Sequence, residues 1–239
     1  MKNKIGTWIT SFNQHTLEII SNSGFNWICI DLEHSDISEK ETNLLISIAK
    51  KNNIKPYVRI PSKSEENFKK ALDAGAIGII VPMVETKEDV DDIIRFSHYA
   101  PFGKRSFGLY SHNLYGIKKN YLKVKDYKPE IILQIESLKG INNLESILSN
   151  KFIFGTLIGR YDLSLTLNDP GNFKSKKFNS CIKKYFSVSK KKKIKTGIHI
   201  ADFNLKNIKS EISKYDFVAI GTDFIFLKKM CDLLFKKIK

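Results

Sequence analysis

Three ionisable side chains, Asp31, Glu33 and His34, directly follow the apolar segment Trp27–Ile30. Burying such groups costs free energy unless they have partners or a task. A histidine beside carboxylates is suited to act as a general base near neutral pH. We therefore interpret His34 as a candidate base, with Asp31 as a polar neighbour in the same site. The alternative is a surface turn in which all three groups are solvated.

Arg59 interrupts the apolar run Tyr57–Ile60. An arginine at this place is suited to bidentate capture of a carboxylate or of an enolate oxygen, and a structural ion pair is the alternative. Asp73 stands near the end of a predicted helix, where the helix dipole disfavours an acid. Its carboxylate could orient His34, as in catalytic dyads, but taken alone this residue is better explained by a capped turn.

Two further carboxylates, Glu136 and Asp162, follow later apolar segments. Strand alternation places Gln134 and Glu136 on one face, so the amide and the carboxylate point the same way. Two carboxylates leave coordination positions for water and substrate oxygens, as Mg²⁺ or Mn²⁺ prefers. Alternatively, Asp162 caps a short helix and Glu136 pairs with Arg160. Of the remaining histidines, His199 is interpreted as a core residue, and His15 and His98 as helix surface.

All these residues need elements that bring them together, and eight short apolar segments are candidates for strands. The predicted strands are Ile5–Thr10, Trp27–Asp31, Tyr57–Ile60, Gly78–Val81, Ile131–Ile135, Gly155–Ile158, Thr196–Ile200 and Phe217–Ile220. The predicted helices are Thr16–Ser23, Ser38–Asn52, Glu65–Ala74, Lys87–His98, Ile141–Leu148, Lys177–Lys190, Leu205–Ser213 and Phe224–Lys237.

Eight strand-then-helix units with near-continuous apolar strands predict a closed α/β barrel, a (βα)8 fold, as a single domain over residues 1–239. In such a barrel, polar residues just past each strand face the active site. An open doubly wound sheet is the alternative, but its usual glycine-rich first turn is missing from Thr10–Asn13. The long connection Ala100–Glu130 is expected to hold a small helix at Lys118–Lys125.

The net charge is +15, from 40 Lys and Arg against 25 Asp and Glu. The excess is mostly lysine spread over helices, so we expect no nucleic acid as a partner, whereas small anionic substrates would be attracted. Three widely separated cysteines indicate neither disulfides nor a zinc site. With no signal peptide and no apolar run long enough for a membrane, we expect a cytoplasmic protein.

Taken together, these segments resemble the HpcH/HpaI aldolase family, the metal-dependent (class II) pyruvate aldolases. The order and spacing of the motifs carry the resemblance over almost the whole chain: Gly6–Trp8, Gly24–Trp27, Ile30–His34, Leu72–Gly75, Val81–Val84, Tyr99–Arg105, Gln134–Glu136 and Asp162–Ser164.

The resemblance implies a role for each matching residue. Glu136 and Asp162 match the ligands of a divalent metal (Mg²⁺, Mn²⁺ or Co²⁺), and Arg59 matches the arginine that holds the enolate oxygen of pyruvate. His34 matches the catalytic base and Asp73 its carboxylate partner. Asp31 and Gln134 match polar residues of the family that support the water bound to the metal and the part of the site that holds the aldehyde.

The resemblance also implies a homo-oligomer, built from dimers and often reaching hexamers, that exchanges the last helix between subunits. One departure is Arg160, where the family usually has proline, and this cation could add an anion-binding group for the substrate. A second is the near absence of the N-terminal helix, which would leave the start of the barrel less covered.

The expected reaction is reversible cleavage of a 4-hydroxy-2-oxo acid into pyruvate, or a close 2-oxo acid, and an aldehyde through a metal-stabilised enolate. The nearest alternative is a related lyase acting on an acyl-CoA thioester or a phosphoenolpyruvate-type substrate. An alternative of another class is a non-catalytic basic barrel that binds nucleic acid or an acidic partner. The aldehyde stays open, with a weak indication of a sugar-derived one.

Overall fold

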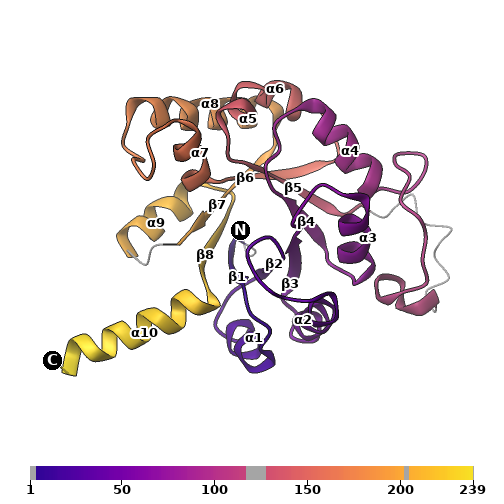
Figure 1. Ribbon diagram of the computed structural model, residues 1–239, viewed down its shortest axis with the longest axis horizontal. Coiled ribbons are helices and arrows are strands. Elements are labelled where there is room, and N and C mark those ends of the chain that lie inside the picture. The colour runs from indigo at the N-terminus through magenta and orange to yellow at the C-terminus, as the bar shows by residue number, and fades with distance from the viewer. Residues whose placement is uncertain (1–3, 117–127, 202–204, 239) are drawn as a thin grey trace.

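The computed structural model describes residues 4–116, 128–201 and 205–238, in which eight parallel strands close into a barrel in the order β1 to β8 (Figure 1). The expected (βα)8 barrel is therefore confirmed. The strands are β1 Ile5–Ile9, β2 Trp27–Asp31, β3 Lys55–Arg59, β4 Gly78–Val81, β5 Glu130–Ile135, β6 Ile153–Ile158, β7 Lys195–Ile200 and β8 Phe217–Thr222.

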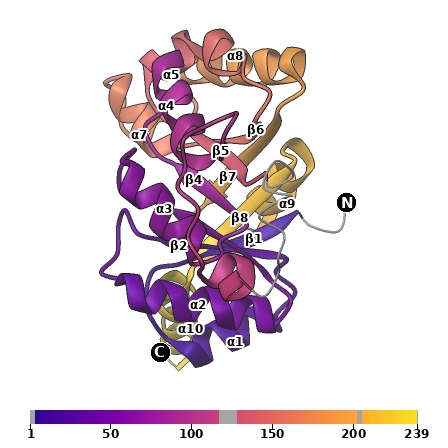
Figure 2. The same ribbon diagram turned by 90° about the vertical axis from the view of Figure 1, so that its right-hand side faces the viewer.

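Helices follow the strands and surround the barrel (Figures 1 and 2). They are α1 Gln14–Ser21, α2 Glu39–Lys51, α3 Glu65–Asp73, α4 Lys87–Ser97, α5 Leu138–Asn142, α6 Leu144–Ile147, α7 Arg160–Thr166, α8 Lys176–Lys192, α9 Leu205–Lys214 and α10 Asp223–Ile238, with a 3-10 helix, η1, at Ser111–Gly116. The helix predicted at Lys118–Lys125 lies outside the described residues.

Local sequence signals explain where several helices begin. A capping box starts α2, because Ser38 Oγ accepts a hydrogen bond from Glu41 N and the Glu41 carboxylate accepts one from Ser38 N. A second box, from Thr86 and Asp89, starts α4. These caps satisfy backbone N–H groups that a helix start leaves free. They also fix where each helix departs from the strand before it.

Apolar side chains form two separate layers, as strand alternation requires. One face of each strand packs against the surrounding helices, where Leu17, Leu45, Phe68 and Tyr185 are fully buried. The other face fills the barrel interior. Its members are Trp8, Trp27, Cys29, Tyr57, Ile80, Ile132, Leu157, Phe217 and Ala219. The interior is therefore a packed core, and open sites lie only at its two ends.

The C-terminal face of the barrel is the end where the strands finish, and the N-terminal face is the end where they start. Helix α10 leaves the barrel after β8 and extends away from it (Figure 1). Large apolar residues of this helix are exposed, among them Leu227, Met230 and Phe235. Within the described parts of the chain, no helix combines the length and apolar character that crossing a membrane requires.

Candidate active site

Arg59 is fixed at the C-terminal face by two acids that follow β2. Its Nε and Nη2 donate to the two carboxylate oxygens of Asp31 at 2.8 and 2.7 Å, and Nη1 lies 2.8 Å from a Glu33 oxygen. The guanidinium also lies over the Trp8 ring, 4.1 Å from its centroid. Burial alone would lower the pKa of Arg59, but the hydrogen bonds to Asp31 and the nearby negative charges of Asp31 and Glu33 together outweigh it and raise this pKa. The cation is thus held in one orientation.

Glu136 follows β5 and is buried, with 3% of its surface exposed. One carboxylate oxygen accepts a hydrogen bond from Met83 N at 2.7 Å, and the other accepts one from Gln134 Nε2. Burial raises the pKa of Glu136; the two hydrogen bonds oppose the rise, and the nearby carboxylates of Asp162 and Glu33 add to it. Glu136 forms no ion pair with a basic side chain in the described residues. The alternative pairing with Arg160 is therefore not formed.

The Met83 amide is presented to Glu136 by an unusual backbone conformation. Met83 has φ of 48°, in the left-handed region that few residues other than glycine adopt. Lys63 Nζ donates to the Met83 carbonyl at 2.9 Å and to Asp89 Oδ1 at 2.7 Å. Lys63 therefore ties down the peptide that orients the carboxylate. The sequence analysis indicated neither the Met83 amide nor Lys63 as part of the site.

Asp162 reaches the site from the first turn of α7. Its side chain is exposed, and its charge acts on both Glu136 and Glu33. The helix begins at Gly159 rather than at Asp162, so Asp162 is not the capping residue. Gly159 packs directly on Glu136: a Cβ atom there would lie 2.6 Å from both Cβ and Oε2 of Glu136. Glycine thus allows β6 to approach the buried carboxylate.

Arg160 follows this glycine, and its guanidinium lies over the Phe173 ring, 5.0 Å from the centroid. Its Nε is buried and has no hydrogen-bond acceptor. It pairs with no carboxylate among the residues that the structure describes. A half-buried cation with one face on an aromatic ring and no counter-ion is available to bind an anion.

His34 lies exposed in the loop after β2, and its backbone N–H donates to Asp31 Oδ1 at 3.4 Å. Asp73 does not meet it. Instead, Asp73 accepts a hydrogen bond from Arg105 Nη2 at 2.6 Å and lies 3.8 Å from His112 Nδ1. The expected His34–Asp73 pair is therefore not formed within one chain. The reason is topological, because α3 runs back from the C-terminal face and ends at Asp73 near the start of β4.

The other histidine predictions are settled by burial. His199 is half-buried and lies at the edge of the core that was expected to hold it: it stacks on Trp8 with ring centroids 4.8 Å apart, and its Nε2 lies 3.0 Å from Gly221 O. Burial lowers the pKa of His199 to about 4. The prediction that His98 lies on the surface is wrong, because its ring packs on Phe152 and only 2% of the residue is exposed. His15 is exposed, as expected.

Whether the site suits a divalent cation can be tested on its donors. Glu136 is a buried carboxylate that meets no cationic side chain in the described ranges, and Asp162 adds a second carboxylate beside it. Gln134 Oε1 is buried and receives no hydrogen bond from the residues that the structure describes. In the described part of the chain, no three His, Cys, Asp or Glu side chains converge as ligands. The donor set therefore fits a hard cation that keeps positions for water and substrate oxygens.

The comparisons with known proteins agree with this architecture. The sequence profile of HpcH/HpaI aldolase/citrate lyase matches residues 4–225. The chain is 34% identical over 164 residues to the hydroxypyruvate/pyruvate aldolase of Roseobacter denitrificans, covering 68% of this chain and 64% of the relative. It thus spans less than two thirds of that relative's length. A 5-keto-4-deoxy-D-glucarate aldolase of Klebsiella pneumoniae is 28% identical over 227 residues, covering 92% of this chain and 86% of the relative.

The fold matches a solved HpcH/HpaI aldolase/citrate lyase family protein from Burkholderia cenocepacia with a TM-score of 0.91, over 99% of this chain and 95% of that one. At 21% identity, this likeness bears on the fold alone. The match to the family profile extends from the start of β1 into α10 and includes every residue of the site described above. The chain therefore belongs to the HpcH/HpaI aldolase/citrate lyase family, as its motifs indicated, and is an enzyme of the aldolase and lyase type.

Proposed function

We propose that this chain is a divalent-metal-dependent aldolase that reversibly cleaves a 4-hydroxy-2-oxo acid into pyruvate, or a close 2-oxo acid, and an aldehyde. The observation that carries the proposal is the buried Glu136 carboxylate, which has two hydrogen-bond donors but no cationic partner in the described part of the chain, beside Asp162 and the fixed Arg59. The names of the relatives, a pyruvate aldolase and a 5-keto-4-deoxy-D-glucarate aldolase, support the same reaction class.

Glu136 and Asp162 would hold the cation, which as Mg²⁺, Mn²⁺ or Co²⁺ supplies Lewis acidity that stabilises an enolate. Arg59 contributes a positive charge whose position Asp31 and Glu33 fix, so no reorganisation is needed when negative charge develops on the substrate oxygen. Gln134 holds Glu136 in place through Nε2 and keeps Oε1 free for a water or a substrate hydroxyl.

His34 is the group that we assign to proton transfer, because it is an exposed imidazole at the C-terminal face. In the cleavage direction it takes the proton of the 4-hydroxyl group. The bond between C3 and C4 breaks, the aldehyde leaves, and the electron pair forms the enolate of the 2-oxo acid. A proton returned to C3 completes pyruvate. Within one chain His34 acts without Asp73, whose carboxylate pairs with Arg105.

The direct test is a panel of aldehydes incubated with pyruvate, with and without Mg²⁺, Mn²⁺ or Co²⁺, comparing the native protein with Glu136→Ala. The native protein should form aldol product only when metal is added, and Glu136→Ala should form no product with or without metal. Glu145→Ala is the matched control, because Glu145 is an exposed acid paired with Lys191 on the barrel surface. Equal turnover by the native protein and Glu136→Ala would refute the proposed metal site. Full activity in the presence of a chelator would refute the metal dependence of the reaction.

We also propose that Arg160 binds an anionic group of the substrate, since its guanidinium has an aromatic contact but no carboxylate partner among the described residues. Arg160→Gln should raise KM for aldehydes that carry a carboxylate or phosphate and leave KM for neutral aldehydes unchanged. Equal KM changes for both kinds of aldehyde would contradict this role.

We further propose that the protein is a homo-oligomer that buries the exposed apolar side chains of α10 against a second copy. Phe224, Leu227 and Leu234 are each more than half exposed, and helical spacing places them on one face of α10. An exposed apolar surface of this kind typically marks an interface. Light scattering should give a mass above that of one chain, and Leu227→Glu with Leu234→Glu should reduce it. A native monomer would contradict the proposal.

A further inference from the structure

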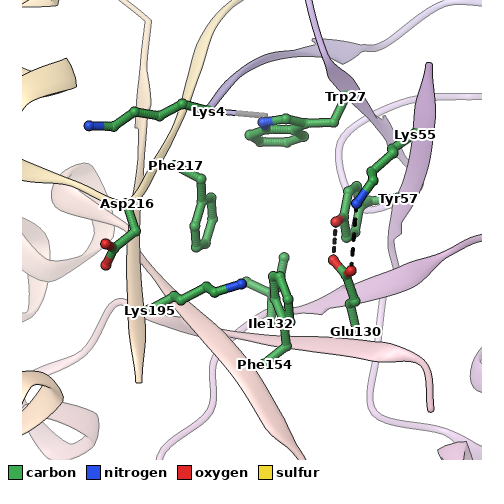
Figure 3. A pocket seen from close by; sticks show the side chains of 10 residues that line it. All are labelled: Lys4, Trp27, Lys55, Tyr57, Glu130, Ile132, Phe154, Lys195, Asp216 and Phe217. Atoms are coloured by element: carbon green, nitrogen blue, oxygen red, sulfur yellow. Dashed lines mark hydrogen bonds and ion pairs between the residues drawn. The ribbon is translucent and has the colours of Figure 1, made fainter. Parts of the chain in front are cut away.

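A cavity of about 510 Å³ opens at the N-terminal face of the barrel, at the end opposite Glu136 and Asp162 (Figure 3). Five strands contribute their first residue to its wall, as expected for a site at the start of a parallel barrel. These residues are Trp27, Lys55, Glu130, Lys195 and Phe217. The barrel core, which includes Cys29, Ile80, Ile132 and Leu157, lies between this cavity and the candidate active site.

Aromatic rings make up much of the cavity wall. The Trp27 ring meets Tyr57 and Phe217 edge to face, with centroids 5.7 and 6.1 Å apart. Two glycines make room for these rings, since a Cβ at Gly6 would lie 2.1 Å from Trp27 and one at Gly197 would lie 2.1 Å from Phe217. The rings are therefore held in place by packing, and the small exposed parts of Trp27 and Phe217, 4% and 8%, form a rigid aromatic wall.

Around the cavity, the acidic side chains have hydrogen-bond donors, whereas two of the lysines have no acidic partner among the described residues. The two carboxylates have donors within the chain: Glu130 accepts from Tyr57 and lies 3.8 Å from Lys55 Nζ, and Asp216 accepts from the Thr196 backbone at 2.8 Å. Lys195 instead lies over the Phe154 ring at 3.9 Å. Neither Lys195 nor Lys4 pairs with an acid in the described residues. The cavity therefore holds positive charge that is not neutralised.

One neutral donor beside the cavity also lacks an acceptor. Trp27 is 4% exposed, and its indole N–H is buried without a hydrogen bond in the described ranges. Figure 3 shows the indole nitrogen on the side of the ring turned toward Lys4. A buried donor without an acceptor is costly, so an acceptor placed there would be stabilising.

We propose that this N-terminal cavity is a binding site for a small aromatic carboxylate, separate from the active site. The flat walls of Trp27 and Phe217 receive the ring, and Lys4 and Lys195 bind the carboxylate. The aromatic faces select against non-planar acids, and the unpaired lysines select against neutral rings. This inference stands independently of the proposed aldolase activity, because none of its residues belongs to the C-terminal face.

The test uses benzoate as the probe and 5-fluorotryptophan as the reporter. The chain has two tryptophans, so two fluorine resonances are expected. Trp8 lies at the C-terminal face under Arg59 and Trp27 lies at the cavity, and a Trp8→Phe variant assigns the two signals. Benzoate should shift the Trp27 signal in a saturable way and leave the Trp8 signal in place. A shift of the Trp8 signal alone, or no saturable shift, would overturn the proposal.

Matched probes and variants locate the binding chemistry. Cyclohexanecarboxylate, which keeps the charge but not the flat ring, should bind about threefold to tenfold more weakly than benzoate. Benzyl alcohol, which keeps the ring but not the charge, should bind at least about tenfold more weakly. Lys195→Gln should weaken benzoate binding about tenfold. Lys4→Gln, in the segment before β1, is a second variant that should also weaken it. Lys190→Gln is the control, because it removes an equal charge from an exposed position.

Three outcomes would overturn the site. Benzoate binding that Lys190→Gln weakens as much as Lys195→Gln and Lys4→Gln would show non-specific attraction to a basic protein. Equal affinity for benzoate and cyclohexanecarboxylate would show that the site does not recognise the aromatic ring. Competition between benzoate and pyruvate, with loss of binding in Glu136→Ala, would place the benzoate at the C-terminal face instead.

Discussion

Gly159→Ala is a substitution whose effect follows from one contact. Gly159 has φ of −87° and ψ of 92°, a conformation that alanine also adopts, so the backbone itself accepts the change. The new methyl group, however, would lie 2.6 Å from Cβ and from Oε2 of Glu136. Because Glu136 Cβ is tied to the β5 backbone, rotation of the carboxylate alone cannot relieve the clash.

The size of the effect can be estimated from the geometry. Unbonded carbon atoms pack at about 3.5–4.0 Å, so Glu136 and Gly159 must separate by about 1 Å. A movement of that size would break at least one of the hydrogen bonds from Met83 N and Gln134 Nε2. A hydrogen bond to a charged group contributes about 1.5–3 kcal/mol. We therefore expect Gly159→Ala to weaken divalent-metal binding about tenfold to a hundredfold.

Isothermal titration with Mn²⁺ measures this change directly, and kcat/KM for aldol cleavage should fall in parallel. Gly24→Ala is the control: Gly24 has φ of 92°, so alanine is strained there, but no atom lies within 4 Å of the added Cβ. That variant should lose stability and keep its Mn²⁺ affinity. If folded Gly159→Ala bound Mn²⁺ as tightly as the native protein, Glu136 would not be the metal ligand that we propose.

Three further predictions concern other contacts. Arg59→Lys removes the paired bonds to Asp31 and should lower kcat/KM about a hundredfold, whereas an unchanged kcat/KM would exclude Arg59 from the reaction. Lys63→Gln releases the Met83 carbonyl and should weaken Mn²⁺ binding about tenfold, because the peptide that orients Glu136 loses its support, and Asp89→Asn should do the same to a smaller degree. Burial lowers the pKa of His98 from 6.5 to about 4, so the neutral ring stabilises the fold fully above pH 6.5, and this stability is lost as the pH falls toward 4. The free energy of unfolding in urea, measured from pH 7.5 to 4.5, should show that loss in the native protein. His98→Gln should lack this pH-dependent contribution, and identical pH profiles for the two proteins would contradict the prediction.

Much of the fold could be predicted from the sequence because its signals are local. Apolar segments of strand length alternate with amphipathic helices, and Ser38 with Glu41 marks a helix start that the structure reproduces. The alternation of β5 placed Gln134 and Glu136 on one face, and the structure joins them by a hydrogen bond. Strand β3 begins earlier than predicted, at Lys55, because neighbouring strands pair with it despite Pro56.

The parts that could not be predicted depend on contacts between distant segments. A left-handed conformation at Met83 has no signal in the residue type, so its amide donor and the supporting Lys63 were not anticipated. In the sequence, His98 looks like a surface residue at a helix end. Its ring is buried because Phe152, more than fifty positions later in the chain, packs against it. Asp73 was assigned to His34 from its residue type, whereas the direction of α3 takes it to Arg105.

Strand β5 connects the two ends of the barrel, because Glu130 stands at its start and Gln134 and Glu136 at its end. At about 3.3 Å per residue, Glu130 and Glu136 are about 20 Å apart, so neither carboxylate contacts a molecule bound at the other end. The packed apolar core fills the barrel between them. Strands β2 and β3 likewise begin with cavity residues, Trp27 and Lys55, and end with active-site residues, Asp31 and Arg59. A substitution that changes only side-chain contacts at one end therefore leaves the other end in place, whereas a shift of β2, β3 or β5 along its own axis would move both.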